Sequence, residues 1–436
     1  MLQRDFIEKT LPTHRPRDSK TPVALSGIRV IDFTHYVAGP FASLILADLG
    51  ADVIKIESPQ KGDDFRRYPP HDDALEHQGA PFLWSNRNKR SVALNLKSAE
   101  GLDLAKKLLR DADVLIENFS SGVLDRLGLS AKDCLEANPR LVYCSVSAYG
   151  REGQFKDRLG FDAIVQAESG FMSLNGYQDR EGVRTGASVM DVGAAMMASN
   201  AILAALFHRT TSGKGQFVEV ALFDTAITMN GYTSMQHLFS GVDAQRYGNT
   251  GPDTSPTGVF RASDQPFYVH CGNTAIFDRL FTQVLDRTDI SEQPQYREGA
   301  GRLAAREHLF ALMQDIFQTK PWAHWRELLR AANVPAGEVR TIRQAVHSPE
   351  AAERELVSRI PHPQVGWIPN VAIPIRMAAT PLANPVRAPA LGEHTADVLA
   401  QVLGLTTAEI AELASKGAIG AIETSNHPAT KEPSHA

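Results

Sequence analysis

Short apolar runs alternate with amphipathic segments along the first half of the chain. Runs rich in β-branched residues predict strands at 28–34, 52–57, 113–119 and 141–146. Apolar residues at helical spacing predict helices at 39–49 and 98–112, the second with Ser98 as its N-cap. Because strands that alternate with helices pair in parallel, the pattern predicts an α/β fold with a Rossmann-like, doubly wound sheet.

The pattern changes after residue 190. Residues 191–208 are apolar on nearly every face, which predicts a helix buried inside a domain or in an interface. A strand at 217–222 and a helix at 224–239 follow it. The Gly- and Pro-rich stretch 240–256 predicts a loop. The remaining predicted elements are a strand at 267–271, helices near 277–286, 303–318 and 321–332, a linker or extended segment at 361–389, and a last helix at 407–413 capped by Thr407.

Composition and charge exclude several classes of protein. The chain has 436 residues and a formal net charge of -5, so no basic footprint for nucleic acid is present. Three cysteines without CxxC spacing predict a reducing compartment, no disulfide framework and no zinc site. The charged N-terminus lacks a signal-peptide core, and the apolar stretch 194–207 is shorter than a membrane span requires. We therefore expect a cytoplasmic protein with no membrane partner.

The turn after the first strand excludes the common nucleotide sites. Residues 34–40 (THYVAGP) contain one glycine, whereas a dinucleotide site needs GxGxxG for the close approach of the pyrophosphate. No GxxxxGK[ST] motif occurs in the sequence either, so a P-loop is excluded.

Basic residues gather where a phosphate ligand could bind. Three cations lie within 86–91, and Lys97, Asn118-Phe119 and Arg126 come after predicted strands. Because ligands bind at the carboxyl ends of parallel strands, these residues suit a nucleotide phosphate with a stackable base. A solvated basic turn and a core phenylalanine explain the same spacing, and from spacing alone this alternative is favoured.

A carboxylate stands at the start of the apolar helix. Asp191 could simply cap that helix. Alternatively it is a nucleophile, oriented and kept charged by helix N–H groups, with Gly193 leaving room for a substrate. Asp162 is a second acidic candidate, and its alternative is an exposed turn residue.

Long stretches of the sequence resemble the family III coenzyme A transferases, whose relatives include formyl-CoA:oxalate and carnitine CoA-transferases and α-methylacyl-CoA racemase. The stretches are LSGIRVIDFTHYVAGPFASLILADLGADVIKIESPQKGDDFR, NRNKRSVALNLK, DVLIENFSSGVLDRLG, SGKGQFVEVALFDTA and APALGEHT. The resemblance implies an interlocked homodimer. It also implies an N-terminal extension (1–24), a Rossmann-like CoA-binding domain (25–230), a small α+β domain (231–332), a linker returning to the large domain (333–420) and a flexible tail (421–436).

The resemblance also implies roles for particular residues. Asp191 falls on the family's nucleophile, so acyl-CoA and a small carboxylic acid would be the substrates, without a tightly bound cofactor or a metal. The implied CoA contacts are Tyr36, Val37, Leu94, Asn95, Leu96, Lys97, Asn118, Phe119, Ser120, Arg126 and Arg158. Ser58 stands where some relatives have an arginine, and no glycine run matches the loop of the oxalate enzymes, which puts oxalate specificity in doubt.

One triplet separates transfer from racemisation. The racemase branch carries Gly-His-Asp, and the matching residues here are Gly160-Phe161-Asp162. Since phenylalanine cannot carry a proton, the sequence favours a CoA-transferase with an aspartyl intermediate. A racemase-like enzyme and an inactive CoA-binding protein are the alternatives.

Overall fold

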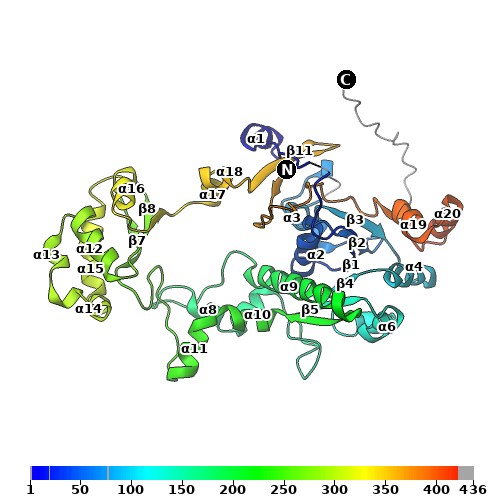
Figure 1. Ribbon diagram of the computed structural model, residues 1–436, viewed down its shortest axis with the longest axis horizontal. Coiled ribbons are helices and arrows are strands. Elements are labelled where there is room, and N and C mark those ends of the chain that lie inside the picture. The colour runs from blue at the N-terminus through cyan, green and yellow to red at the C-terminus, as the bar shows by residue number, and fades with distance from the viewer. Residues whose placement is uncertain (1, 19, 76–77, 421–436) are drawn as a thin grey trace. The chain divides into compact units, whose positions relative to one another are not determined.

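The computed structural model describes residues 2–18, 20–75 and 78–420 (Figure 1), so the predicted tail 421–436 lies outside the described residues. The chain divides into two compact units. Unit 1 takes in the described parts of 1–169, 187–229 and 349–436, and unit 2 takes in 170–186 and 230–348. Residues 170–186 thus group with unit 2, although the sequence analysis places them in the large domain.

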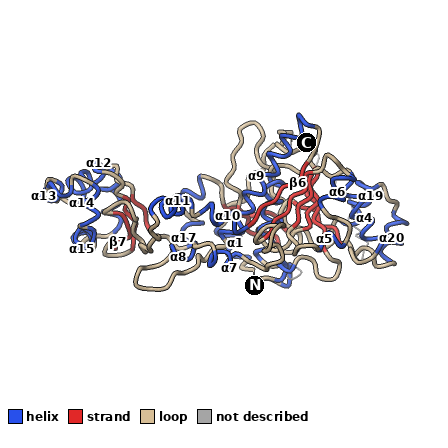
Figure 2. The backbone as a smooth tube through the Cα atoms, turned by 90° about the horizontal axis from the view of Figure 1, so that it is seen from below, coloured by secondary structure: helices blue, strands red, loops and turns tan. Residues whose placement is uncertain are grey.

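A parallel sheet of six strands forms the centre of unit 1 (Figure 2). Its strand order is β3-β2-β1-β4-β5-β6, the order of a doubly wound nucleotide-binding fold, which confirms the predicted α/β class. The order reverses between β1 and β4, which makes their carboxyl ends the topological switch point. The strands are β1 Arg29–Phe33, β2 Asp52–Glu57, β3 Lys89–Ala93, β4 Val114–Glu117, β5 Val142–Ser147 and β6 Gln216–Ala221.

Helices cover both faces of this sheet. On one face α2 (Ala38–Asp48) packs against α9 (Val189–Ser212). On the other face α4 (Ala99–Arg110), α6 (Ala131–Ala137), α19 (Thr395–Leu403) and α20 (Thr407–Ser415) enclose an apolar core. The shorter helices of unit 1 are α1 Arg4–Thr10, α3 Ala80–Asn86, α5 Val123–Arg126, α7 Asp162–Glu168, α10 Leu222–Met229 and α18 Pro349–Glu353, with 3-10 turns at Asp64–Arg67 and Asp73–Leu75.

Helix α9 is longer than predicted, and one of its sides is buried within unit 1. It has 24 residues and is long and apolar enough to span a membrane by length and composition. Met190, Ala198 and Ile202 are buried within unit 1, as in a core helix, whereas Met197 and Phe207 are exposed. The helix is therefore buried on one side rather than on all faces.

Three further predictions are corrected. The predicted helix 224–239 is two helices, α10 and α11 (Gly231–Ser240), because the chain turns at Gly231 with a φ of +46°. Part of the predicted linker is an antiparallel hairpin of β10 (Val357–His362) and β11 (Gly366–Val371), whose prolines are tolerated because both strands are edges. Thr406 rather than Thr407 caps α20, and Glu409 completes a capping box.

Unit 2 has an α+β architecture. Its antiparallel sheet has the order β7-β8-β9, with strands Thr257–Arg261, Pro266–His270 and Ala336–Glu338. Phe260, Phe267, Phe317 and Trp325 form an aromatic core between this sheet and the helices. The helices are α8 Phe171–Leu174, α11, α12 Thr274–Arg279, α13 Thr288–Ser291, α14 Gly299–Ala304, α15 Arg306–Phe317, α16 Trp322–Ala331 and α17 Ile342–Val346, with a π turn at Leu280–Val284 and a 3-10 turn at Pro294–Tyr296.

Candidate active site

Two loops meet at the switch point of the unit 1 sheet. Asn118, after β4, accepts a hydrogen bond from the N–H of His35 and donates one to the His35 carbonyl, both at 2.8 Å. The ring of His35 lies 5.4 Å from that of Phe119. The predicted contact residues of the first turn and of 118–120 therefore lie together, and the Asn118 amide is already used to join the two loops.

The first turn has a constrained backbone. Tyr36 has a φ of +66°, which is uncommon for a residue with a side chain. Its N–H donates to Oδ1 of Asp63 at 3.1 Å. Gly39 lets the start of α2 pack closely against the Thr34 side chain, since a Cβ at residue 39 would lie 2.4 Å from it. Such strained turns, held by their surroundings, are typical of ligand sites.

A buried network of charges supports this turn from below. Lys55 donates to the Thr34 carbonyl at 2.6 Å and lies 3.0 Å from Asp63, while Lys89 lies 3.1 Å from Asp32. Burial alone would raise the pKa of Asp32, but Lys89 and Lys55 lower it to about 2. The network therefore holds ionised groups in fixed positions beneath the turn.

The cations of 86–91 are not available to a phosphate. Arg87 pairs with Asp48, Lys89 with Asp32, and Arg90 with Asp52 at 2.6 Å. These pairs argue against a polyanion role for the cluster, because each cation is neutralised within the fold. The alternative that the spacing favours, a solvated basic turn, also differs from the structure, because Arg87 and Lys89 are buried.

The segment 94–97 offers a ligand few side chains. Leu94 is part of the buried core, and Asn95 is occupied by the carbonyls of Ala418 and Gly417 at 2.9 and 3.1 Å. Lys97 and, after β4, Arg126 are exposed, and within the described residues their side chains make no ion pair or hydrogen bond. Lys97 and Arg126 are therefore two free cations near this edge of the sheet.

Two arginines near the site differ from what the sequence indicates. Arg158, a predicted CoA contact, is paired with Glu168 and lies 4.8 Å above the Tyr149 ring. Arg151 donates to the Phe119 carbonyl at 2.8 Å and to both oxygens of Glu117. It holds the loop after β4 in place, and no motif or periodicity in the sequence marks it.

Asp162 caps the helix that carries Asp191. Its Oδ2 accepts the N–H groups of Met190 at 2.7 Å and of Asp191 at 3.3 Å. The side chain comes from the first residue of α7, and the residue is 8% exposed. Asp162 is therefore not an exposed turn residue, and Asp191 is not the cap of α9.

Asp191 has an unusual protonation state. Burial and the neighbouring charge of Asp162 raise the pKa of Asp191 to about 7. The prediction that helix N–H groups keep Asp191 charged is wrong, because Asp162 accepts those groups. The prediction for Gly193 is also wrong, since a Cβ there would lie 2.9 Å from the Met229 sulfur, so this glycine lets α10 pack closely.

An aromatic contact links the first turn to this acidic pair. The ring of Tyr36 lies 6.1 Å from that of Phe161, edge to face, and Phe161 directly precedes Asp162. Phe161 is 65% exposed. The switch-point turn, Phe161 and the Asp162–Asp191 pair therefore form one continuous site.

Metal ligands were sought among the side chains that the structure describes. Among the described residues, no group of three or more His, Cys, Asp and Glu side chains is placed to hold a metal ion. Cys134, Cys144 and Cys271 are all buried as free thiols.

Comparisons with known proteins identify the family of this chain. The profile of CoA-transferase family III matches residues 25–395. The succinate--glutarate CoA-transferase of Agrobacterium fabrum is 37% identical, covering 87% of this chain and 95% of its own. The succinyl-CoA:glutarate CoA-transferase of Homo sapiens is 31% identical and covers 94% of both chains. A CAIB/BAIF family protein from Brucella suis has a TM-score of 0.77 and 34% identity, covering 87% of this chain and all of its own. The chain therefore belongs to CoA-transferase family III.

Proposed function

We propose that this protein moves CoA from an acyl-CoA thioester to a free carboxylic acid through a covalent intermediate on Asp191. The observation that carries the proposal is the half-buried carboxyl of Asp191 at the start of α9, with its pKa raised to about 7 beside Asp162. A carboxyl group with this pKa is a better nucleophile when ionised than an ordinary aspartate, and it is still partly ionised at neutral pH.

CoA would bind along the carboxyl edge of the unit 1 sheet. Lys97 and Arg126 would pair with its phosphates, and the Phe119 ring offers a stacking surface for the base. Val37 and Leu94 are buried, so they would contribute main-chain contacts only. The remaining proposed contacts are Tyr36, Asn95, Leu96, Asn118, Ser120 and Arg158.

The proposed chemistry proceeds in four exchanges. The Asp191 carboxylate attacks the donor thioester, which gives a mixed anhydride and CoA thiolate. The thiolate attacks the Asp191 carbonyl, which forms an aspartyl-CoA thioester and releases the donor acid. The acceptor carboxylate attacks this thioester and expels the thiolate. The thiolate then attacks the acceptor carbonyl, which gives the new acyl-CoA and restores Asp191.

Asp162 would act as a positioning residue. It fixes the first turn of α9, and its charge raises the pKa of Asp191. The N–H groups of Met190 and Asp191 bond to Asp162, so they are not free to stabilise an oxyanion.

The residue at position 161 argues against the racemase-like alternative. Phe161 occupies the position where the racemase-like alternative needs a histidine, and its ring packs against Tyr36. The geometry therefore supports the transferase.

The names of the relatives suggest the substrate class. The names of the relatives from Agrobacterium fabrum and Homo sapiens contain succinate or succinyl-CoA and glutarate, and both acids have two carboxyl groups. We infer that succinyl-CoA is a donor and that a dicarboxylic acid such as glutarate is the acceptor.

The test compares Asp191→Asn with Asp224→Asn, a change at an exposed aspartate outside the site. With succinyl-CoA and glutarate, we expect Asp191→Asn to lose at least about 10³-fold in turnover, because no nucleophile remains, and Asp224→Asn to keep it. Hydroxylamine added with succinyl-CoA should label Asp191 in the wild-type protein. Wild-type turnover by Asp191→Asn, or an unlabelled Asp191 in a protein that binds CoA, contradicts the proposal and favours the inactive CoA-binding protein.

A further inference from the structure

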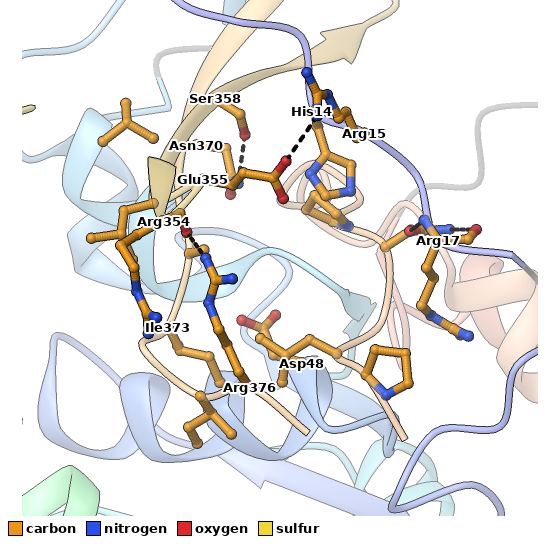
Figure 3. Close-up of a pocket in the computed structure, with 18 of the residues that line it drawn as sticks. His14, Arg15, Arg17, Asp48, Arg354, Glu355, Ser358, Asn370, Ile373 and Arg376 are labelled. Carbon is orange, nitrogen blue, oxygen red and sulfur yellow. Dashed lines mark hydrogen bonds and ion pairs between the residues drawn. The ribbon is translucent and has the colours of Figure 1, made fainter. Parts of the chain in front are cut away.

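A cavity of about 550 Å³ lies in unit 1, at the edge of the sheet opposite the switch point (Figure 3). Asp48 ends α2 and Arg87 precedes β3, so both lie at the amino ends of the strands. The other walls come from stretches near 12–17, 352–358, 372–377 and 381–385. This amino-edge cavity shares no residue with the proposed CoA site.

Positive charge is in excess around the amino-edge cavity. Five arginines and two carboxylates line it. Asp48 is paired with the buried Arg87, and Glu355 lies 3.5 Å from Arg15. The three arginines without a carboxylate partner among the described residues are Arg17, Arg354 and Arg376.

Most N–H donors of these three arginines have no hydrogen-bond acceptor among the described residues. Arg17 donates to the carbonyls of Asp18 and Thr21, and Arg376 donates to the Arg354 carbonyl. The guanidinium of Arg354 makes no hydrogen bond within the described part of the chain. Each guanidinium carries five N–H donors in a planar fork, so most of these donors remain open to a ligand.

Two buried nitrogen atoms of the wall also lack a partner. Nε2 of His14 and Nε of Arg17 are buried without a hydrogen bond to any described residue. Buried polar atoms are normally satisfied, and an unsatisfied one often marks the place of an ion or a water molecule. Both residues line the same cavity as the unpaired arginines, so one acidic ligand could satisfy the whole set.

We propose that the amino-edge cavity binds a small molecule with at least two negative charges on phosphate or carboxylate groups. Guanidinium forks match both kinds of group, and they bind them bidentately. The cavity volume lies within the range of small-molecule sites in proteins. Leu356, Ile373 and Met377 offer apolar surface for the uncharged part of the ligand.

Binding would connect segments that are distant in sequence. Arg17 precedes the first strand, whereas Arg354 and Arg376 flank the β10–β11 hairpin. A ligand that pairs with all three binds the folded state and not the unfolded chain, so it raises the unfolding temperature.

The test titrates the full chain with sodium pyrophosphate and, separately, with sodium glutarate, at constant ionic strength in a calorimeter. The informative variant is Arg354→Gln with Arg376→Gln, since both side chains are exposed. Arg110→Gln, at an exposed position on α4, is the matched control. Lys97→Gln with Arg126→Gln removes the free cations of the proposed CoA site, so it distinguishes the two sites.

We expect saturable binding of at least one probe to the wild type, the control and the Lys97/Arg126 variant, and at least about tenfold weaker binding to the Arg354/Arg376 variant. The probe that binds identifies the charged group that the cavity selects. Should the double variant fail to fold, Arg354→Gln and Arg376→Gln carry the test singly, each with about threefold weaker binding. Three results overturn the proposal: no saturable binding of either probe, equal affinity in the Arg354/Arg376 variant, or loss of binding in the Lys97/Arg126 variant alone.

Discussion

At the scale of single residues, Asp162 and Asp191 divide two tasks between them. Asp162 accepts the N–H groups at the start of α9, and Asp191 is left with a raised pKa. The sequence identified Asp191 as the candidate nucleophile from its place before an apolar helix and from the family resemblance. It could not assign the capping task, because the acceptor lies 28 residues away along the chain and reaches α9 only in the tertiary fold.

The raised pKa of Asp191 predicts the pH dependence of the transferase. Since the ionised form is the nucleophile, we expect kcat/KM to rise with pH and to level off above the pKa of about 7. Asp162→Asn removes the neighbouring charge but keeps an oxygen for the Met190 N–H, so the rising limb should move to lower pH. A pH profile of kcat/KM for both proteins provides the measurement. An unmoved limb in Asp162→Asn would show that Asp162 does not set the pKa.

The raised pKa of Asp191 also predicts how the stability of the fold depends on pH. The folded-state pKa of Asp191 lies above its value of 3.8 in a free chain, so this group stabilises the fold at low pH, and the contribution is lost as pH rises through about 7. Asp191→Asn cannot ionise, so it should unfold roughly 1–3 °C higher than the wild type at pH 8. The difference should disappear at pH 4. Thermal unfolding at the two pH values tests this, and equal unfolding temperatures at pH 8 would contradict it.

At the scale of elements, one glycine holds three segments together. Gly101 lies in the first turn of α4, and a Cβ there would lie 2.2 Å from the Asn95 carbonyl oxygen and 2.9 Å from that of Ala418. Both neighbours are backbone atoms, so they cannot rotate away. We expect Gly101→Ala to lower the free energy of unfolding by about 1–3 kcal/mol and, because 94–97 must move, to raise KM for the acyl-CoA.

Gly337→Ala is the matched control for this prediction, because a Cβ at that position would meet no described atom within 4 Å and its backbone is not in the left-handed region. Chemical unfolding and steady-state kinetics of both variants give the two readouts. An unfolding free energy for Gly101→Ala equal to that of the control would show that the segments adjust without cost.

Elements could be predicted where local pattern and tertiary fold agree. Strands β1, β2, β4 and β5 are β-branched runs, and Ser98 caps α4 as its sequence indicates. The β10–β11 hairpin was missed because Pro361 and Pro369 argue against a strand, and only pairing at an open edge makes them acceptable. The break between α10 and α11 depends on one glycine that the apolar pattern passes over.

At the scale of the whole molecule, the sequence does not reveal which buried charged residues pair beneath the site. Lys55 and Lys89 interrupt apolar strands. Asp63, the partner of Lys55, comes from a loop, and Asp32, the partner of Lys89, comes from β1, two strands away from β3 in the sheet. The sequence shows such residues as isolated charges, because strand order and register decide which of them meet. For the same reason the cations of 86–91 looked free for a ligand, although each pairs within the fold.

The predicted homodimer has a candidate surface in unit 2. Tyr232, Met235, Leu238 and Phe239 of α11 follow helical spacing and are 63–93% exposed. A contiguous apolar face of this kind is uncommon on a monomer and is typical of an interface. We therefore expect light scattering to give about twice the chain mass of 47.6 kDa. Because interlocked subunits separate only on unfolding, the variants are refolded from the unfolded chain, and we expect Leu238→Glu with Phe239→Glu to shift the refolded protein toward the monomer. Phe155→Glu, at an exposed aromatic residue in unit 1, should leave the mass unchanged. A wild-type mass of one chain would contradict the dimer, and an unshifted mass in the double variant would place its interface elsewhere than α11.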